Sequence, residues 1–488
     1  MRRTILAIIL GCASFASAQT FLELSPLSGQ SQSNGFAVSP DGSRYGGTSN
    51  SSNIWPVWWN SSGTPSQLTS SSGQGYVYAM TNSAFSGFLY SSSLEQAQLW
   101  SASSSSPTDL GTLPDSDRDI AHGMSHSGSV IVGWARETGN TRLRGWVWTS
   151  GGGIVDLETA GSDLQASRSA YGISGNGLVI VGFASTDSGS RFCSWTEILG
   201  QWEVSVASNV PNFSSRALDA NYDGSVIVGW LTPSGGGSRA LRYAGGTFTE
   251  IISSIPSRAT AVDDSGDIVV GYYEPTTTSG NHAFIWTPDG NVIDLNDVAV
   301  VPSGYTLREA TGISADGSTI VGNVHTGTHT RGFVLKPFVA VSPFSIVTTV
   351  GEEFEGDETS VSSSDNERYS AFNDNTSLEC EIEVEGQFTV STANQLRFTV
   401  ELSVARAGLA YLHQLYKFST SSWVNGVGAT APLVDTTATT TRVSDALGFF
   451  DSNHKVKARI QFSPINDEDP SLDGWLHSID FVEWRKLG

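Results

Sequence analysis

A phrase of about 14 residues recurs along residues 35–338, and it constrains the fold more than any other feature of the sequence. The phrase reads Ala, an apolar-Ser-x-Asp-Gly turn and Val-Ile-Val-Gly, followed by a loop, an aromatic strand and an Asp-Leu-like strand. The clearest copies are Ala121–Trp134, Ala170–Phe183, Ala217–Trp230, Ala259–Tyr272 and Ala310–Asn323. Two weaker copies are Gly35–Gly47 and Tyr78–Gly87. The spacing of these copies defines seven units of roughly 40–51 residues.

Each unit is expected to form four short strands. Alternating residues, a Gly-bearing turn and a β-branched run are typical of a β-hairpin, and two more short strands follow. A four-stranded unit of this period is typical of a propeller blade. An open stack of the same units, a solenoid, is the alternative.

The two ends of the repeat region favour a closed ring. The last unit stops after its third strand at residues 332–335, and a segment that resembles a fourth strand, Phe21–Leu27, precedes the first unit. If segment 21–27 completes the last blade, the ring closes and no sheet edge is left open to aggregation. The sequence thus predicts an all-β, seven-bladed β-propeller over residues 19–338.

The phrase resembles the HAF-type extracellular repeat, a bacterial export-associated family with propeller-like sequences. The resemblance covers about residues 20–338, strongly in five copies and weakly in two. It implies secretion and a propeller fold, and it carries over no catalytic residue.

The N-terminus is typical of an export signal. Arg2 and Arg3 precede an apolar core, and an Ala-x-Ala site ends at Ala18, which predicts a signal peptide over residues 1–18. Lipidation at Cys12 is the alternative processing event. The sequence predicts a secreted or cell-surface protein with no integral membrane span. The formal net charge of −22 argues against nucleic-acid binding.

The phrase stops after residue 338. The acidic stretch 339–365 is predicted to be a linker or domain entry, and residues 366–488 are predicted to be a β-sandwich because apolar residues alternate at strand spacing. Glutamates fill the outer positions of one strand, 378–385, and cations those of another, 455–462. Opposite charges stabilise neighbouring strands, so these two are expected to pair.

One column of cationic residues stands just before the third strand of five units. Its members are Arg144, Arg191, Arg239, His282 and Arg331. Such a circle is a candidate ligand site for a polyanion. The alternative is that each cation anchors its own blade.

The remaining polar motifs indicate no metal or cofactor. The Ser-x-Asp-Gly turns resemble sialidase Asp-boxes, but Asp and Gly are also the residues that tight turns require. His122/His126 and His325/His329 would form a zinc pair only on a helix. The acidic runs 115–119 and 467–473 lack calcium-loop spacing.

These features predict a secreted, non-enzymatic protein. It is expected to bind an extracellular polysaccharide or protein through the face of the propeller that bears the longer, variable loops. An extracellular glycan hydrolase is one alternative, and it requires two carboxylates converging on one cleft with a perturbed pKa. A structural cell-envelope protein is the other.

Overall fold

The computed structural model describes most of the chain and divides it into two compact units, Thr20–Pro337 and a unit that contains Phe338–Gly488. The described residues are 20–68, 73–91, 94–104, 106–157, 168–186, 189–206, 214–234, 236–276, 280–287, 290, 292–341, 345–350, 352–355, 369–372, 380–388, 395–404, 409–432, 436–442, 446–464 and 476–487. The predicted signal peptide, Cys12 and the acidic run 467–473 lie outside these ranges, as does the greater part of the predicted linker.

The protein is an all-β protein with a propeller-like N-terminal unit. The only helices within the ranges just given are α1 (Leu295–Val298) and a 3-10 helix, Ala446–Phe449, of four residues each. A helix that crosses a bilayer needs about 20 residues, so neither is long enough to do so.

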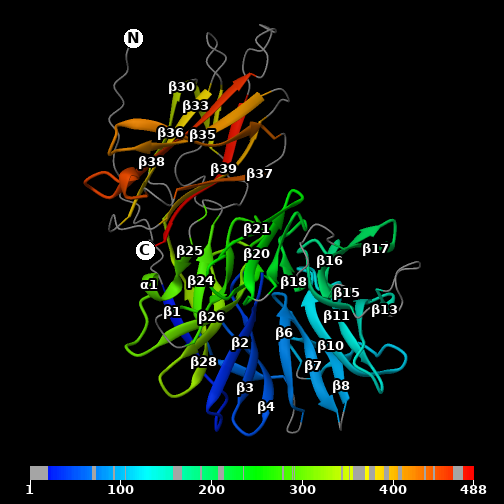
Figure 1. The fold of residues 1–488 in the computed structure, drawn as a ribbon. Helices are drawn as coiled ribbons and strands as arrows, with labels where there is room; N and C mark the ends of the chain where they lie inside the picture. The colour runs from blue at the N-terminus through cyan, green and yellow to red at the C-terminus, as the bar shows by residue number, and fades with distance from the viewer. Residues whose placement is uncertain are drawn as a thin grey trace, which may run out of the picture. The chain divides into compact units, whose positions relative to one another are not determined.

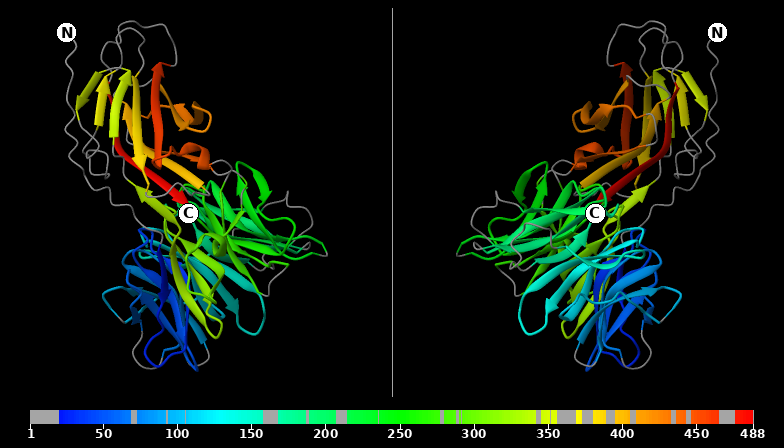
Figure 2. Two further views of the ribbon diagram at one scale, coloured as in Figure 1. Left: turned by 90° about the vertical axis from the view of Figure 1, so that its left-hand side faces the viewer. Right: turned by 90° about the vertical axis from the view of Figure 1, so that its right-hand side faces the viewer.

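In the N-terminal unit, consecutive strands form antiparallel sheets that follow one another along the chain (Figure 1; Figure 2). The first sheets contain β2 (Gln32–Val38), β3 (Tyr45–Asn50), β4 (Ile54–Trp59) and β5 (Pro65–Gln67), then β6 (Gly75–Met80), β7 (Ala84–Ser91), β8 (Leu94–Ser101) and β9 (Thr108–Asp109). Next come β10 (Ser116–Met124), β11 (Val130–Glu137), β12 (Leu143–Thr149) and β13 (Gly153–Asp156), then β14 (Arg168–Ile173), β15 (Val179–Thr186), β16 (Gly189–Ile198) and β17 (Gln201–Val206). The last contain β18 (Ser214–Ala220), β19 (Val226–Thr232), β20 (Arg239–Ala244) and β21 (Thr247–Glu250), then β22 (Ser257–Val262), β23 (Val269–Tyr273), β24 (His282–Trp286) and β25 (Val292–Asp294), and finally β26 (Thr306–Ile313), β27 (Ile320–His325) and β28 (Thr330–Lys336).

The sheet of the last repeat unit is completed from the start of the described chain. Strand β1 (Thr20–Leu24) pairs antiparallel with β28, from Thr20 opposite Lys336 to Leu24 opposite Gly332. The strand order in this sheet is β1-β28-β27-β26. The ends of the repeat region are therefore held in one sheet.

Two neighbouring repeat units share a sheet, which the sequence did not predict. Their strands form one eight-stranded sheet because β10 and β8 meet in parallel at a single pair, Arg118 opposite Glu95. The same two side chains form an ion pair of 2.7 Å.

The repeated Gly after Val-Ile-Val has a steric cause. Every first strand carries a β-bulge at the second residue of the phrase, for instance between Ala170 and Gly172. The bulge presses the preceding carbonyl against the Gly of the second strand, so a Cβ on Gly182 would lie 1.9 Å from the Ser169 oxygen. A Cβ at the equivalent glycine of each other unit would lie 1.9–2.0 Å from a carbonyl oxygen. Only glycine fits at this distance.

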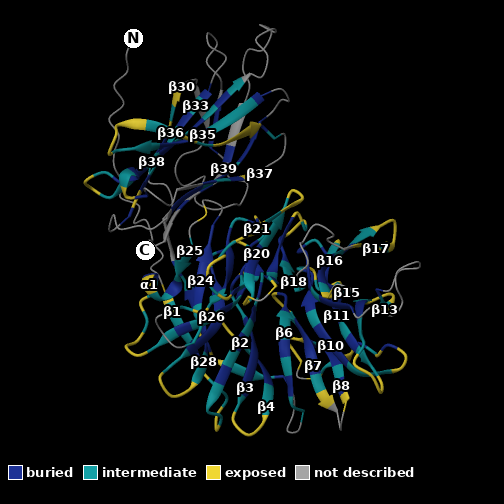
Figure 3. Ribbon diagram, in the orientation of Figure 1, coloured by how far each residue is buried: buried dark blue, intermediate teal, exposed yellow. Residues whose placement is uncertain are grey.

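The apolar side chains of the repeat are buried between adjacent sheets (Figure 3). Trp59, Trp100, Trp146 and Trp195, from third strands, are completely buried. The turns are joined by backbone hydrogen bonds between successive units, including Asp264 N to Ala315 O and Ala315 N to Pro40 O. The second of these bonds connects the last unit directly to the first.

The C-terminal unit consists of two antiparallel sheets. One contains β31 (Glu352–Glu355), β32 (Tyr369–Phe372), β39 (Leu476–Leu487), β34 (Gln395–Val404) and β37 (Thr436–Arg442), with β29 (Phe338–Val341) also paired to β39. The other contains β30 (Ser345–Val350), β33 (Cys380–Gln387), β38 (Lys455–Pro464), β35 (Leu409–Lys417) and β36 (Ser422–Thr430). The two sheets contribute to a single hydrophobic core that includes Cys380, Phe398 and Trp484.

The predicted pairing of the glutamate and cation strands is confirmed. Strands β33 and β38 are antiparallel neighbours, and their outer side chains form three ion pairs. These join Lys455 to Glu385, Lys457 to Glu383 and Arg459 to Glu381.

The predicted linker over 339–365 needs correction. Its first part forms strands β29, β30 and β31, which pair within the sheets of the C-terminal unit. The segment Ser345–Val350 has the sequence SIVTTV, whose β-branched residues favour a strand. The acidic residues nearby had suggested a solvated segment.

Candidate active site

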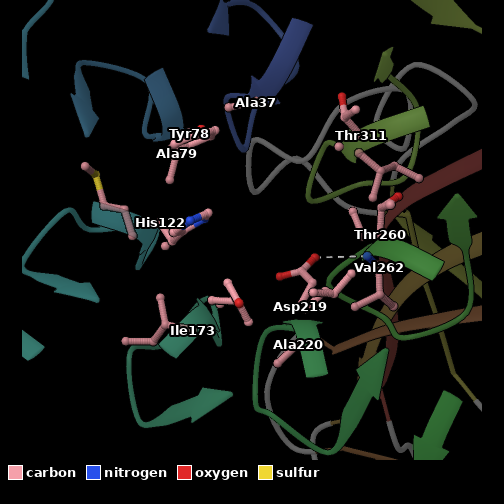
Figure 4. A pocket seen from close by; sticks show the side chains of 18 of the residues that line it. Ala37, Tyr78, Ala79, His122, Ile173, Asp219, Ala220, Thr260, Val262 and Thr311 are labelled. Carbon is pink, nitrogen blue, oxygen red and sulfur yellow. Dashed lines mark hydrogen bonds between the residues drawn. The ribbon is translucent and has the colours of Figure 1, made fainter. Parts of the chain in front are cut away.

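A pocket of about 450 Å³ lies where the first strands of the repeat units converge. It is lined by equivalent residues of β2, β6, β10, β14, β18, β22 and β26 (Figure 4). Its volume is within the range of small-molecule sites. The second residue of each phrase, displaced by the bulge, faces this pocket together with the third.

The position that follows the bulged residue of each first strand is small in every unit but one. Its occupants are Ala37, Ala79, Gly123, Gly172, Ala261 and Gly312, and in the remaining unit Asp219. Asp219 therefore places a carboxyl group where the other first strands present only a methyl group or a hydrogen. Figure 4 shows it pointing into the pocket.

The environment of Asp219 favours a neutral carboxyl group. Burial raises its pKa to about 7, and the nearby charge of Asp264 adds to the shift. Hydrogen bonds from the backbone N–H groups of Val262, at 3.0 Å, and Ala220 oppose the shift. A carboxyl group with a pKa near 7 can exchange a proton at neutral pH.

A second carboxyl group, Asp264, lines the same pocket from the turn after β22. Burial, with the charges of Asp263 and Asp316, raises the pKa of Asp264 to about 7. The Nε2 atom of His126 lies 3.5 Å from its Oδ1 atom, and burial lowers the pKa of His126. Two acids with raised pKa values and a neutral imidazole thus share one pocket.

Aromatic rings line another part of the pocket wall. The rings of Phe36 and Tyr78 are 5.6 Å apart, Tyr78 stacks on His122 at 4.6 Å, and Tyr171 contacts His122 edge-on at 5.2 Å. Burial lowers the pKa of His122 to about 4, so this imidazole is neutral at pH 7. His122 points into the pocket in Figure 4.

The predicted cation column lies elsewhere, because none of its five members lines this pocket. Arg144 pairs with Asp156, Arg239 with Glu250, His282 with Asp294 and Arg331 with Glu23. Each of these acids stands at the same register position of the neighbouring outer strand.

Arg191 differs from the other four. Val206 occupies the position of the acid in its unit, and the Arg191 side chain is buried. Its Nη1 atom lies 3.5 Å from the Ser190 carbonyl oxygen. The cationic column is thus part of the sheets. These contacts agree with the alternative interpretation, in which each cation anchors its own repeat unit.

The Asp-Gly turns form local contacts, as the turn interpretation requires. The Ser39 hydroxyl donates to Asp41 at 2.6 Å, and Ser314 donates to Asp316 at the same distance. Gly42 and Gly317 have φ angles of 67° and 71°.

The acidic run 115–119 also forms contacts within the protein. Asp117 pairs with Arg136, and Asp119 accepts a hydrogen bond from Ser116.

Sequence reasoning missed Asp219, Asp264 and His126 as a group. The candidate residues of the sequence were those that recur from unit to unit, whereas Asp219 departs from the repeat. The signal was present in the sequence ALDANYDG, where Asp replaces the small third residue.

The comparisons with known proteins give structural matches only. No protein-family model matches the chain, and no curated protein matches it in sequence. Among solved structures, the chain resembles an oligogalacturonate lyase from Vibrio parahaemolyticus at 12% identity and a TM-score of 0.41, covering 66% of this chain and 98% of that one. It also resembles TolB from Acinetobacter baumannii (11%, TM-score 0.36, 60% and 79% covered) and a puromycin-hydrolysing peptidase from Mycobacterium tuberculosis (14%, TM-score 0.40, 60% and 50% covered).

The prediction of a non-enzymatic binding protein is wrong. The pocket is lined by two carboxyl groups with raised pKa values, Asp219 and Asp264, and an enzymatic site commonly contains such groups.

Proposed function

We propose that the protein is an enzyme that hydrolyses a glycosidic bond in the pocket between its first strands. The observation that carries this proposal is Asp219, the one charged residue at a position that is otherwise Gly or Ala. With a pKa of about 7, about half of the Asp219 carboxyl groups carry a proton at neutral pH, and the protonated form can act as a general acid.

Asp219 and Asp264 have complementary roles in this reaction. Asp219 donates its proton to the glycosidic oxygen as the bond between that oxygen and the anomeric carbon breaks. The Asp264 carboxylate takes a proton from a water molecule, and the water oxygen bonds to the anomeric carbon. One water is consumed, and before the next cycle Asp264 releases the proton it took to solvent while Asp219 takes one up from solvent.

The aromatic wall suits a saccharide substrate. The rings of Phe36, Tyr78 and Tyr171 offer apolar faces, and sugar rings present C–H groups on their own faces. The partly exposed hydroxyl and imidazole groups beside these faces can accept or donate hydrogen bonds.

We further propose the setting in which this enzyme works. The recurring phrase supports membership of the HAF-type extracellular repeat family, a seven-bladed propeller and, after it, a β-sandwich. The Ala-x-Ala site at residues 16–18 supports export of the mature chain to the cell surface or beyond. An extracellular polysaccharide is the substrate that fits this location.

The experiment is hydrolysis of a panel of neutral and acidic polysaccharides, measured as new reducing ends. We expect the Asp219→Asn variant to lose activity by about 10²–10⁴-fold, the usual contribution of a general acid. Asp223→Asn is the matched control, because Asp223 is an exposed turn residue of the same repeat unit, and it should retain full activity. Undiminished activity of Asp219→Asn, or no hydrolysis of any polysaccharide by the unaltered protein, would contradict the proposal.

A further inference from the structure

Two arginines that line the pocket lack the ion pair that several arginines elsewhere in the protein form. Arg118, Arg136, Arg144 and Arg459 each contact a carboxylate at 2.9 Å or less. Arg216 and Arg258 both line the pocket. Among the residues whose structure is described, neither forms an ion pair, although the chain has 48 acidic residues and 26 Lys and Arg.

The two guanidinium groups are held by stacking on aromatic rings. The Arg216 Cζ atom lies 4.5 Å from the centre of the Phe183 ring and 5.5 Å from that of Trp230. The Arg258 Cζ atom lies 4.9 Å from the centre of the same Trp230 ring. Stacking fixes the plane of a guanidinium group and leaves its N–H edges free to donate hydrogen bonds.

The donors of Arg216 are incompletely used. Nη1 donates to the Tyr171 hydroxyl at 3.1 Å, whereas the buried Nε atom has no hydrogen-bond partner in the described part of the protein. Leaving a buried charged donor unsatisfied is costly. A ligand with anionic oxygens in the pocket would complement the positive charge of both arginines.

We infer that Arg216, Arg258 and Trp230 form a subsite for an anionic oxygen group carried by the substrate. The inference rests on the proposed function, which makes the ligand a saccharide, and it specifies that the saccharide is acidic. Carboxylate and sulfate groups share the required chemistry, because both accept charge-assisted hydrogen bonds from guanidinium.

The subsite also has a defined place relative to the proposed acid. Arg216 precedes Asp219 by three residues on β18, and Arg258 holds the same place in β22 as Arg216 does in β18. A saccharide that reaches Asp219 can therefore place a substituent against the arginines.

The test is calorimetric binding to the full-length Asp219→Asn protein, in which the probe is not consumed. The probes are a short oligouronate, its carboxyl-reduced neutral form and a sulfated form of that neutral saccharide. We expect the oligouronate or the sulfated form to bind at least 10-fold more tightly than the neutral form. Adding Arg216→Gln or Arg258→Gln should remove this preference.

Arg242→Gln is the matched control. Arg242 also stacks on a tryptophan, with its Cζ atom 5.5 Å from the Trp286 ring centre, but it does not line the pocket. The preference for an acidic probe should survive this substitution, and the melting temperature of each variant reports whether it is folded.

The outcomes separate the two proposals. Equal binding of all probes, no binding of any probe, or an acidic preference that survives both pocket substitutions would overturn the anionic subsite. Full hydrolytic activity of Asp219→Asn would overturn the proposed catalytic role, and a preference for acidic over neutral probes would then still support the anionic subsite.

Discussion

The charged residues that join the third and outer strands differ from those of the pocket in whether they form ion pairs. On the third strands, Arg144, Arg239 and Arg331 each pair with a carboxylate of the adjacent outer strand. In the pocket, Asp219 replaces a small residue, and Arg216 lacks a carboxylate partner among the residues that the structure describes. Four of the five recurring cations are paired with an acid of the adjacent strand in the same sheet, whereas Asp219, which breaks the repeat, faces the pocket.

This contrast indicates where function is found in a repetitive chain. A side chain needed in every sheet is repeated because every sheet packs against its neighbours in the same way. A catalytic group is needed once, so it stands out as an exception to the repeat. Substitutions in the two regions should therefore separate loss of stability from loss of activity.

The largest effect on stability is expected in the outer strand β1. Leu24 is completely buried in a cluster with Trp59, Val321 and Val334. Leu24→Ala should lower the free energy of unfolding by about 2–5 kcal/mol, measured by urea denaturation. Leu22→Ala, at a partly buried position of the same strand, should cost less. An equal loss from both substitutions would show that β1 does not complete the sheet as described.

A smaller effect is expected from the pH dependence of stability. The folded-state pKa of Asp219 is raised above its ordinary value of 3.8 to about 7. The folded protein therefore retains a proton that the unfolded chain releases between pH 4 and 7, and the free energy of unfolding falls as the pH rises through that window.

Asp219→Asn removes this titration. The variant should exceed the unaltered protein in stability at pH 8 by on the order of 1–3 kcal/mol, with a smaller difference at pH 5. Thermal denaturation at both pH values measures the change. A stability difference that is independent of pH would place the Asp219 pKa near its ordinary value.

The smallest effect is expected from a single outer ion pair. Arg239 and Glu250 are 2.9 Å apart, and each side chain is about one-third exposed. Arg239→Gln should cost about 0.2–1 kcal/mol in unfolding free energy and leave hydrolysis unchanged. A large loss of activity in a folded Arg239→Gln protein would break the distinction between the two regions.

The sequence predicted the sheets well because their causes are local and repeated. Alternation, the Asp-Gly turn and the invariant Gly are each required by a short-range contact, such as that of Gly182 with the Ser169 carbonyl. The charge pattern of 381–385 also sufficed to pair β33 with β38. Residues 345–350 were misjudged because acidic neighbours outweighed their β-branched composition.

The site was harder to predict because it depends on which positions converge in space. Arg216, Asp219 and Asp264 lie in two different repeat units and are brought together only by the convergence of the first strands. The pKa shifts of Asp219 and Asp264 arise mainly from burial, which cannot be seen in the sequence. A comparison of each unit with the other copies, position by position, would have singled out Asp219.

The most direct test of the account is an NMR titration of the aspartate side-chain carboxyl carbons in the ¹³C-labelled full-length protein. We expect two resonances that titrate near pH 7, one of which is absent from Asp219→Asn and the other from Asp264→Asn. If the resonance assigned to Asp219 titrates near pH 4, the carboxyl group is ionised at neutral pH and cannot be the proton donor that this account requires.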